Sequence, residues 1–247
     1  MRLDKFIIGS AKNSPTHQFK NLKDITIDFD QDHWVTVVIG WNGTGKSNVL
    51  EALAIIFRDL IAKKRTPAFA FQLNYRMGAG ENLRQIYIDA DPDREKDAFF
   101  IRVADARQNT QNDLLHSAFD FGDDADTSPQ GEPIKLTAFL NADTEYLPRY
   151  VFSYYSGESS RMHEVFEPYL KSYYKDLLVS KVDLAPKRLF YALPVHSQFV
   201  LLAFLIQPEQ NVKEFLLKEL GIDPENGVES ILFVLREPPW NSRKLSM

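Results

Sequence analysis

The chain has 247 residues, a formal net charge of −5 and no cysteine. This length allows one large domain or two small ones, and the lack of cysteine excludes disulfides, thiolate nucleophiles and cysteine-based zinc sites. The negative charge means that any nucleic-acid-binding surface would have to be a local patch. The longest apolar run, residues 199–206, is too short to span a membrane. We therefore expect a cytoplasmic protein that does not enter membranes.

Two short strands are predicted near the N-terminus, over residues 5–9 and 25–29. The β-branched and apolar run 34–39 predicts a buried strand. Residues 47–57 follow with apolar side chains at helical spacing, and Pro67 is expected to stop that helix. The order is therefore strand, short connection, helix.

The connection is Gly40-Trp41-Asn42-Gly43-Thr44-Gly45-Lys46-Ser47. It fits the phosphate-binding loop (Walker A) pattern G-x-x-x-x-G-K-[ST], in the strand-to-helix context that this loop requires. Its glycines let the main chain approach phosphates, and its N–H groups form an anion nest at a helix N-terminus. Lys46 would reach the β- and γ-phosphates and Ser47 would be a ligand of Mg²⁺, so we predict ATP and Mg²⁺ as cofactors.

Three further strand-like runs lie at residues 69–75, 85–88 and 99–103. The turn-rich segments between them predict an antiparallel meander. Residues 121–133 are acidic and turn-rich, which predicts a mobile surface loop.

The surroundings of the phosphate-binding loop resemble the ATP-binding heads of the SMC/RecF group, ABC-type ATPases that act in DNA repair, chromosome handling and bacterial defence. The likeness rests on Asn42, Asn48, the run Leu50-Glu51-Ala52-Leu53 and the upstream Phe19-Lys20-Asn21-Leu22, which looks like the opening hairpin of that family. It implies an α/β P-loop NTPase fold: the N-terminal lobe of an ABC-type head with a core sheet, an antiparallel β subdomain and a helical C-terminal part.

In many members of that group, the basic residue of the hairpin motif lies near the nucleotide phosphates, and Lys20 matches it here. The predicted nucleotide-contacting residues are Gly40, Trp41, Asn42, Gly43, Thr44, Gly45, Lys46, Ser47, Asn48 and Lys20, with Ser47 as the metal ligand. No catalytic residue is assigned.

A further core strand is predicted over residues 150–155, and it ends at Ser156-Gly157-Glu158-Ser159-Ser160. The resemblance allows two functional interpretations of this segment. It is either a degenerate ABC signature or the loop that places a polar residue, here Ser156 or Glu158, near Mg²⁺ and the attacking water. A third interpretation is a simple turn in which Ser159 or Ser160 caps the next helix.

Residues 231–238 imitate a Walker B motif, with a run of apolar residues before Arg236-Glu237-Pro238. The family has Asp where this chain has Arg236, and a guanidinium cannot coordinate Mg²⁺. We therefore do not assign a Walker B motif here, and we expect the signature and the Walker B acids in a C-terminal lobe beyond this chain. The expected domains are an ATPase lobe over 1–160 and a helical subdomain over 161–247.

The resemblance implies a homodimer or higher homo-oligomer with ATP sandwiched between heads. The second half of the chain also resembles bacterial ATPases encoded beside restriction or anti-phage genes. That resemblance implies an effector protein as partner, with DNA as a further candidate. We expect an ATP-binding part of such an ATPase that hydrolyses ATP only with the other lobe and a second head. The alternative is a nucleotide-gated scaffold that binds ATP without needing hydrolysis.

Overall fold

The computed structural model describes residues 1–30, 33, 35–105, 131–157, 159–179, 188–206, 209–223, 230 and 232. The chain forms two compact units, Met1–Ala192 and Leu193–Met247. The first unit extends past residue 160, where we placed the end of the ATPase lobe. The division into two functional domains stays a prediction.

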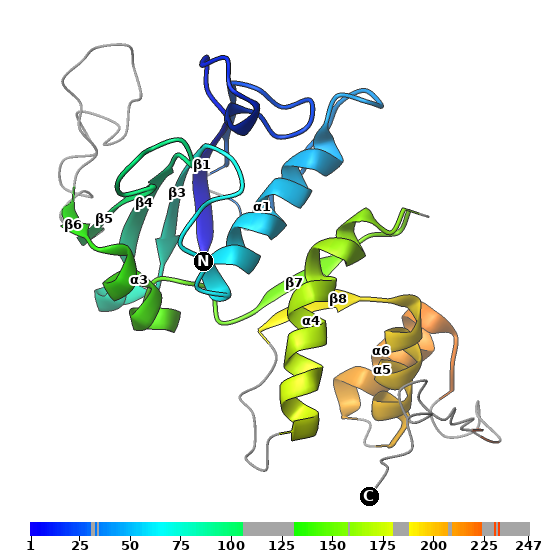
Figure 1. Ribbon diagram of the computed structural model, residues 1–247. Coiled ribbons are helices and arrows are strands. Elements are labelled where there is room, and N and C mark those ends of the chain that lie inside the picture. Colours follow the sequence, from blue (N-terminus) through cyan, green and yellow to red (C-terminus); the bar gives the residue numbers. More distant parts are fainter. Residues whose placement is uncertain are drawn as a thin grey trace, which may run out of the picture. The chain divides into compact units, whose positions relative to one another are not determined.

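A large antiparallel sheet lies on one side of the first unit (Figure 1). Its order is β2-β1-β3-β4-β5-β6, and every neighbouring pair is antiparallel. The strands are β1 (Arg2–Ile8), β2 (Ile25–Asp28), β3 (Phe71–Met77), β4 (Arg84–Ala90), β5 (Phe99–Asp105) and β6 (Glu132–Ile134). The two early strands and the three-stranded meander predicted from the sequence are confirmed, and the chain has the mixed α/β architecture expected.

Helix α1 (Lys46–Ile61) packs its apolar stripe toward this sheet. The ring of Phe57 on α1 meets the edge of Tyr75 on β3, with ring centroids 6.0 Å apart. Tyr75 is fully buried, and its hydroxyl donates to the backbone oxygen of Tyr146 at 2.9 Å. Burying a large apolar side chain contributes about 1.5–3 kcal/mol, so this contact fixes α1 firmly on the sheet.

The rest of the first unit lies around α1. Strands β7 (Val151–Tyr154) and β8 (Leu189–Ala192) form a parallel pair, and α4 (Arg161–Val179) packs against α1 and β8. The short helices are η1 (Pro15–His17), η2 (Gly80–Asn82), α3 (Leu136–Ala142) and η3 (Asp143–Glu145).

The second unit contains α5 (Pro194–Ile206) and α6 (Gln210–Leu220). Phe204 and Phe215 join these helices through an edge-to-face contact with centroids 6.4 Å apart. Of the helices that the structure describes, none is both long and apolar enough to cross a membrane. The Walker B-like segment 231–238 lies outside the described residues apart from Leu232.

The buried strand predicted over residues 34–39 is wrong for the part that the structure describes, residues 35–39. Val35, Val37 and Ile39 are 73%, 72% and 88% exposed, respectively. A parallel-sheet strand is buried only when neighbouring strands flank it and helices cover its faces. Within the described part of the chain, no strand pairs with this segment, so its apolar sequence alone does not produce a strand.

The prediction of a mobile loop over residues 121–133 is also wrong at its C-terminal end. Glu132 and Pro133 belong to β6, in which Pro133 pairs with Arg102 and Ile134 pairs with Ile101. A proline fits an edge strand because it needs no donor on the outer side. Residues 132–134 therefore form a strand because β5 offers them an open edge, although the sequence around them is rich in turn residues. Residues 121–130 lie outside the described part.

A buried ion pair joins β1 to β3. Arg76 donates to both carboxylate oxygens of Asp4, at distances from 2.6 to 3.2 Å, and the side chain of Asp4 is 5% exposed. Burial raises the pKa of Asp4, while the guanidinium acts in the opposite direction. Removing one partner of such a pair leaves an uncompensated charge in the interior.

We expect Arg76→Ala to lower the free energy of unfolding by about 3 kcal/mol, because the buried Asp4 would lose the guanidinium that is hydrogen-bonded to it. Chemical denaturation at neutral pH measures this. Lys171→Ala is the control, since Lys171 forms an exposed ion pair with Glu167 on α4, and it should change stability little. Equal, small effects of both variants would contradict the assignment.

Candidate functional site

The predicted phosphate-binding loop runs directly into α1. Gly43 and Gly45 have left-handed backbones, with φ of +85° and +98°, and Gly45 is the N-cap of α1. A Cβ on Gly45 would lie 2.7 Å from Cδ2 of Leu22. Glycine is therefore favoured at position 45, because another residue would be strained by the left-handed backbone and would require Leu22 to move.

Lys46 lies over this loop. Its ammonium donates to the backbone oxygens of Gly40 at 2.5 Å and Trp41 at 2.7 Å, and the hydroxyl of Thr44 donates to Trp41 at 2.9 Å. Phosphate oxygens are stronger acceptors of a lysine hydrogen bond than neutral carbonyls. Lys46 is thus held at the mouth of the loop by partners that a phosphate can replace, and Ser47 lies beside it in the first turn of α1.

The turn at residues 19–22 supports the loop from the side. Phe19 and Leu22 exchange backbone hydrogen bonds of 2.8 and 2.9 Å. The amide of Asn21 donates to the oxygen of Gly43 at 3.5 Å and accepts from Asn48 at 2.6 Å. The hairpin motif and Asn48, singled out in the sequence, are therefore brought into one contact network.

Lys20 lies in the same turn, in a left-handed conformation with φ of +55°. Its ammonium donates to both carboxylate oxygens of Glu51 on α1, at 2.6 Å each, and Glu51 is buried. The structure places Lys20 beside the first turns of the helix that follows the loop. A direct contact between Lys20 and phosphate stays a prediction.

A family model of the AAA ATPase domain matches residues 17–146, which is more than half of the chain. The chain belongs to the AAA ATPase domain family. The matched segment includes the turn at 19–22, the phosphate-binding loop and α1. Membership supports nucleotide binding, typically with Mg²⁺, and ATPase activity in general. No curated protein matches the chain.

A cavity of about 280 Å³ opens beside the loop of this AAA ATPase domain. Its walls come from Ser47 and the apolar face of α1, from residues 151–155, and from Met162 and Phe166 of α4. Ser159 accepts a 3.4 Å hydrogen bond from the backbone N–H of Arg161, the first residue of α4, so it lies one position before the N-cap, which is Ser160. Glu158 lies outside the described residues, and a role of Ser156 near Mg²⁺ stays a prediction.

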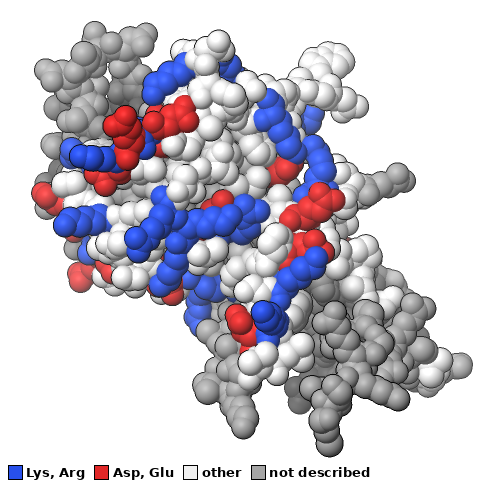
Figure 2. Space-filling view, viewed as in Figure 1, with Lys and Arg blue, Asp and Glu red and all other residues white. Residues whose placement is uncertain are grey.

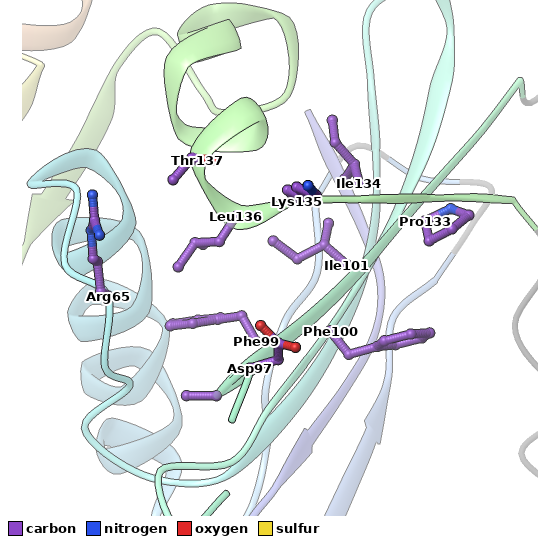
Figure 3. Close-up of a pocket in the computed structure, with 11 residues that line it drawn as sticks. Arg65, Asp97, Phe99, Phe100, Ile101, Pro133, Ile134, Lys135, Leu136 and Thr137 are labelled. Atoms are coloured by element: carbon purple, nitrogen blue, oxygen red, sulfur yellow. The ribbon is translucent and has the colours of Figure 1, made fainter. Parts of the chain in front are cut away.

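A second cavity, of about 660 Å³, lies elsewhere on the AAA ATPase domain (Figure 3). Phe99, Ile101 and Leu136 line its apolar part, and Arg65, Asp97 and Lys135 supply its charged groups. Arg65 follows the C-terminal end of α1, whose 16 residues span about 24 Å. The larger cavity is therefore about a helix length from Lys46 and is separate from the predicted phosphate site.

Many basic groups of the AAA ATPase domain are already neutralised. Figure 2 shows Lys and Arg in a band across one face, with Asp and Glu beside them. Lys64 pairs with Asp59 at 2.9 Å, and Arg94 pairs with Asp89 at 2.6 Å. Paired charges attract a polyanion weakly, so DNA as a partner stays a proposal.

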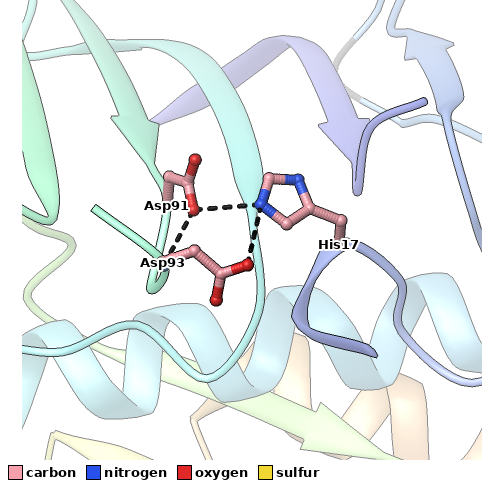
Figure 4. Close-up of side chains that lie close together, drawn as sticks. All are labelled: His17, Asp91 and Asp93. Atoms are coloured by element: carbon pink, nitrogen blue, oxygen red, sulfur yellow. Dashed lines mark hydrogen bonds and ion pairs between the residues drawn. The ribbon is translucent and has the colours of Figure 1, made fainter. Parts of the chain in front are cut away.

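His17, Asp91 and Asp93 form a further cluster of groups that could hold a metal ion (Figure 4). Nε2 of His17 lies 3.1 Å from Asp91 and 3.5 Å from Asp93. Lys12 already supplies a positive charge to Asp91 at 3.1 Å, and Ser10 bonds the other ring nitrogen of His17. The cluster therefore fastens the β1–β2 connection to the β4–β5 turn without needing an ion.

Two carboxyl groups of this cluster have shifted pKa values. Hydroxyl donors, Thr16 first and Ser14 second, lower the pKa of Asp93 below its ordinary value of 3.8. Burial raises the pKa of Asp91, but hydrogen bonds from the Asp93 backbone and Lys12 outweigh it, so that this pKa is also lowered. Lowered values mean that folding favours the charged carboxylates.

The cluster should therefore stabilise the fold fully well above pH 3.8 and lose this contribution as pH falls through the lower pKa values of the folded state. As the pH falls over that acidic range, we expect the free energy of unfolding to decrease less in Asp93→Asn than in the wild type. Denaturant titrations at stepwise pH values measure it. Asp97→Asn, on the same turn but outside the cluster, is the control and should follow the wild type. If the unfolding free energy of Asp93→Asn depended on pH as steeply as that of the wild type, the result would contradict the cluster's role.

The loop geometry gives a matched pair of variants. An alanine at Gly43 would meet nothing within 4 Å, whereas one at Gly45 would meet Leu22 at 2.7 Å. Both substitutions carry a left-handed backbone cost of about 1–2 kcal/mol, and overpacking adds about 1–3 kcal/mol at Gly45 alone. We expect thermal denaturation to show the larger loss for Gly45→Ala. Equal losses would contradict the close contact.

Sequence reasoning missed two charged residues of this site, Glu51 as a partner of Lys20 and Arg161. Arg161 donates from Nη1 to Oδ1 of Asn48 at 3.0 Å, although the two residues are 113 positions apart. The helical spacing of α1 could have suggested that Glu51 lies near Ser47, four positions before it. Nothing local in the sequence places Arg161 there.

Proposed function

We propose that this chain is the ATP-binding part of an SMC/RecF-like, ABC-type ATPase. The observation that carries the proposal is the left-handed glycine pair of the loop, which presents Lys46 and Ser47 at the start of α1 against the turn at 19–22. ATP would bind with its phosphates in the loop, Lys46 at the β- and γ-phosphates and Ser47 on Mg²⁺.

The arrangement of the strands supports the SMC/RecF-like class. The chain order is a β1–β2 hairpin, the phosphate-binding loop, an antiparallel sheet and then the parallel strand β7, as the resemblance implies. Phe152 and Tyr154 on β7 are 66% and 63% exposed, and parallel strands are normally covered on both faces. In the proposal, a C-terminal lobe with the signature and Walker B acids covers them.

Hydrolysis in such a head requires a second head that closes over ATP. We therefore propose a homodimer or higher homo-oligomer with ATP between its subunits, coupled to an effector protein of the anti-phage kind, with DNA as a further partner. The charges of the site fit this assembly, because Lys46 brings a cation to a loop of backbone donors, while Lys20 pairs with Glu51 beside it.

We expect Lys46→Ala to weaken ATP·Mg²⁺ binding by about 100-fold or more, because a charged donor to two phosphates is lost. Isothermal titration calorimetry on the purified chain measures it. Lys64→Ala, beyond the opposite end of α1, is the control and should bind as the wild type does. A wild-type chain without ATP affinity, or unchanged binding by Lys46→Ala, would refute the proposal.

A further inference from the structure

Arg161, the first residue of α4, lies against the phosphate-binding loop. It donates to Asn48 at 3.0 Å, and the same nitrogen is 3.9 Å from a carboxylate oxygen of Glu51. Its side chain is 42% exposed. A small recess brings it together with the predicted Mg²⁺ ligand; the lining residues are Ser47, Glu51, Tyr155, Arg161 and Met162.

The charges in this recess leave Arg161 available for an anion. Glu51 is the nearby carboxylate, and Lys20 already holds both of its oxygens at 2.6 Å. Arg161 lies more than 1 Å farther from that carboxylate, and its other described partner is a neutral amide oxygen. A phosphate is a much stronger acceptor for a guanidinium than an amide is, and it can take two parallel bonds.

The backbone around Arg161 is held in place. The hydroxyl of Ser159 accepts from its N–H, and Arg58 on α1 donates to the backbone oxygen of Val165 at 3.0 Å. In the preceding turn, the backbone of Gly157 lies so close to Tyr155 that a Cβ on Gly157 would be 2.5 Å from the ring. Exchange of partners by Arg161 therefore requires only a rotation of its side chain.

We propose that Arg161 binds the γ-phosphate of ATP in its own subunit and so distinguishes ATP from ADP. In loops of this type, the serine ligand of Mg²⁺ lies beside the β- and γ-phosphates, and Arg161 shares the recess of Ser47. It also follows the carboxyl end of β7, the edge of a parallel sheet at which ligands bind. On ATP binding, the guanidinium leaves Asn48 and pairs with γ-phosphate oxygens. This inference rests on the proposed function.

The test compares affinities for ATP and ADP, each with Mg²⁺, by calorimetry on the full chain. Arg161→Ala should weaken ATP binding by about tenfold or more and ADP binding by less than about threefold, since ADP lacks the γ-phosphate. Arg161→Lys should restore part of the ATP affinity, because it keeps the charge and loses the fork. Unchanged thermal denaturation temperatures show that the variants fold.

Two controls separate binding from positioning. Lys171→Ala changes an exposed charge on the same helix, and Arg58→Ala breaks another contact between α1 and α4. Both should keep the wild-type ratio of ATP to ADP affinity. Equal losses for the two nucleotides in Arg161→Ala, no loss, or the same ATP-selective loss in Arg58→Ala would overturn the inference while leaving the proposed function standing. A wild type that binds neither nucleotide would overturn both.

Discussion

The contact between Gly45 and the turn at residues 19–22 is the constraint on which the rest of the site depends. It sets the backbone of the loop at the point where α1 begins, because a glycine adopts the left-handed angle without strain and leaves room for Leu22 where a Cβ would displace it. The hairpin that carries the turn is part of the large antiparallel sheet. The sheet thereby determines where the first N–H groups of α1 point.

Helix α1 in turn positions α4 on the other side of the site. One face of α1 meets β3 through Phe57 and Tyr75, and Arg58 bonds the backbone of α4 at Val165. The start of α4 consequently lies beside Asn48, which directly follows the phosphate-binding loop. Side chains from the turn, the loop and α4 converge because they share one rigid helix.

The electrostatics follow from the same geometry. The chain as a whole is acidic, yet three cations lie at this site: Lys20 and Arg161 beside a single buried carboxylate, Glu51, and Lys46 over the loop. A carboxylate that is buried without a cation would be costly, and Lys20 meets that need. The remaining two cations then lie next to the backbone donors of the loop, which suits a polyphosphate and not a neutral ligand.

Sequence reasoning succeeded where the cause is local. The antiparallel meander follows from strand and turn composition, while the phosphate-binding role that the contiguous glycines, Lys46 and Ser47 indicate stays a prediction. It failed where a distant partner decides. Residues 35–39 are apolar but have no strand beside them among the residues described, and Glu132 and Pro133 join β6 only because β5 offers an open edge.

The sequence by itself therefore indicated the predicted phosphate-binding loop of this AAA ATPase domain and determined most of its strands, because these depend on neighbouring residues. The tertiary structure alone decided which charges meet at the loop. Lys20 and Glu51 are separated by 31 positions, and Arg161 and Asn48 by 113. Contacts across such distances arise only when the sheet, α1 and α4 have packed, since no pattern along the chain records them.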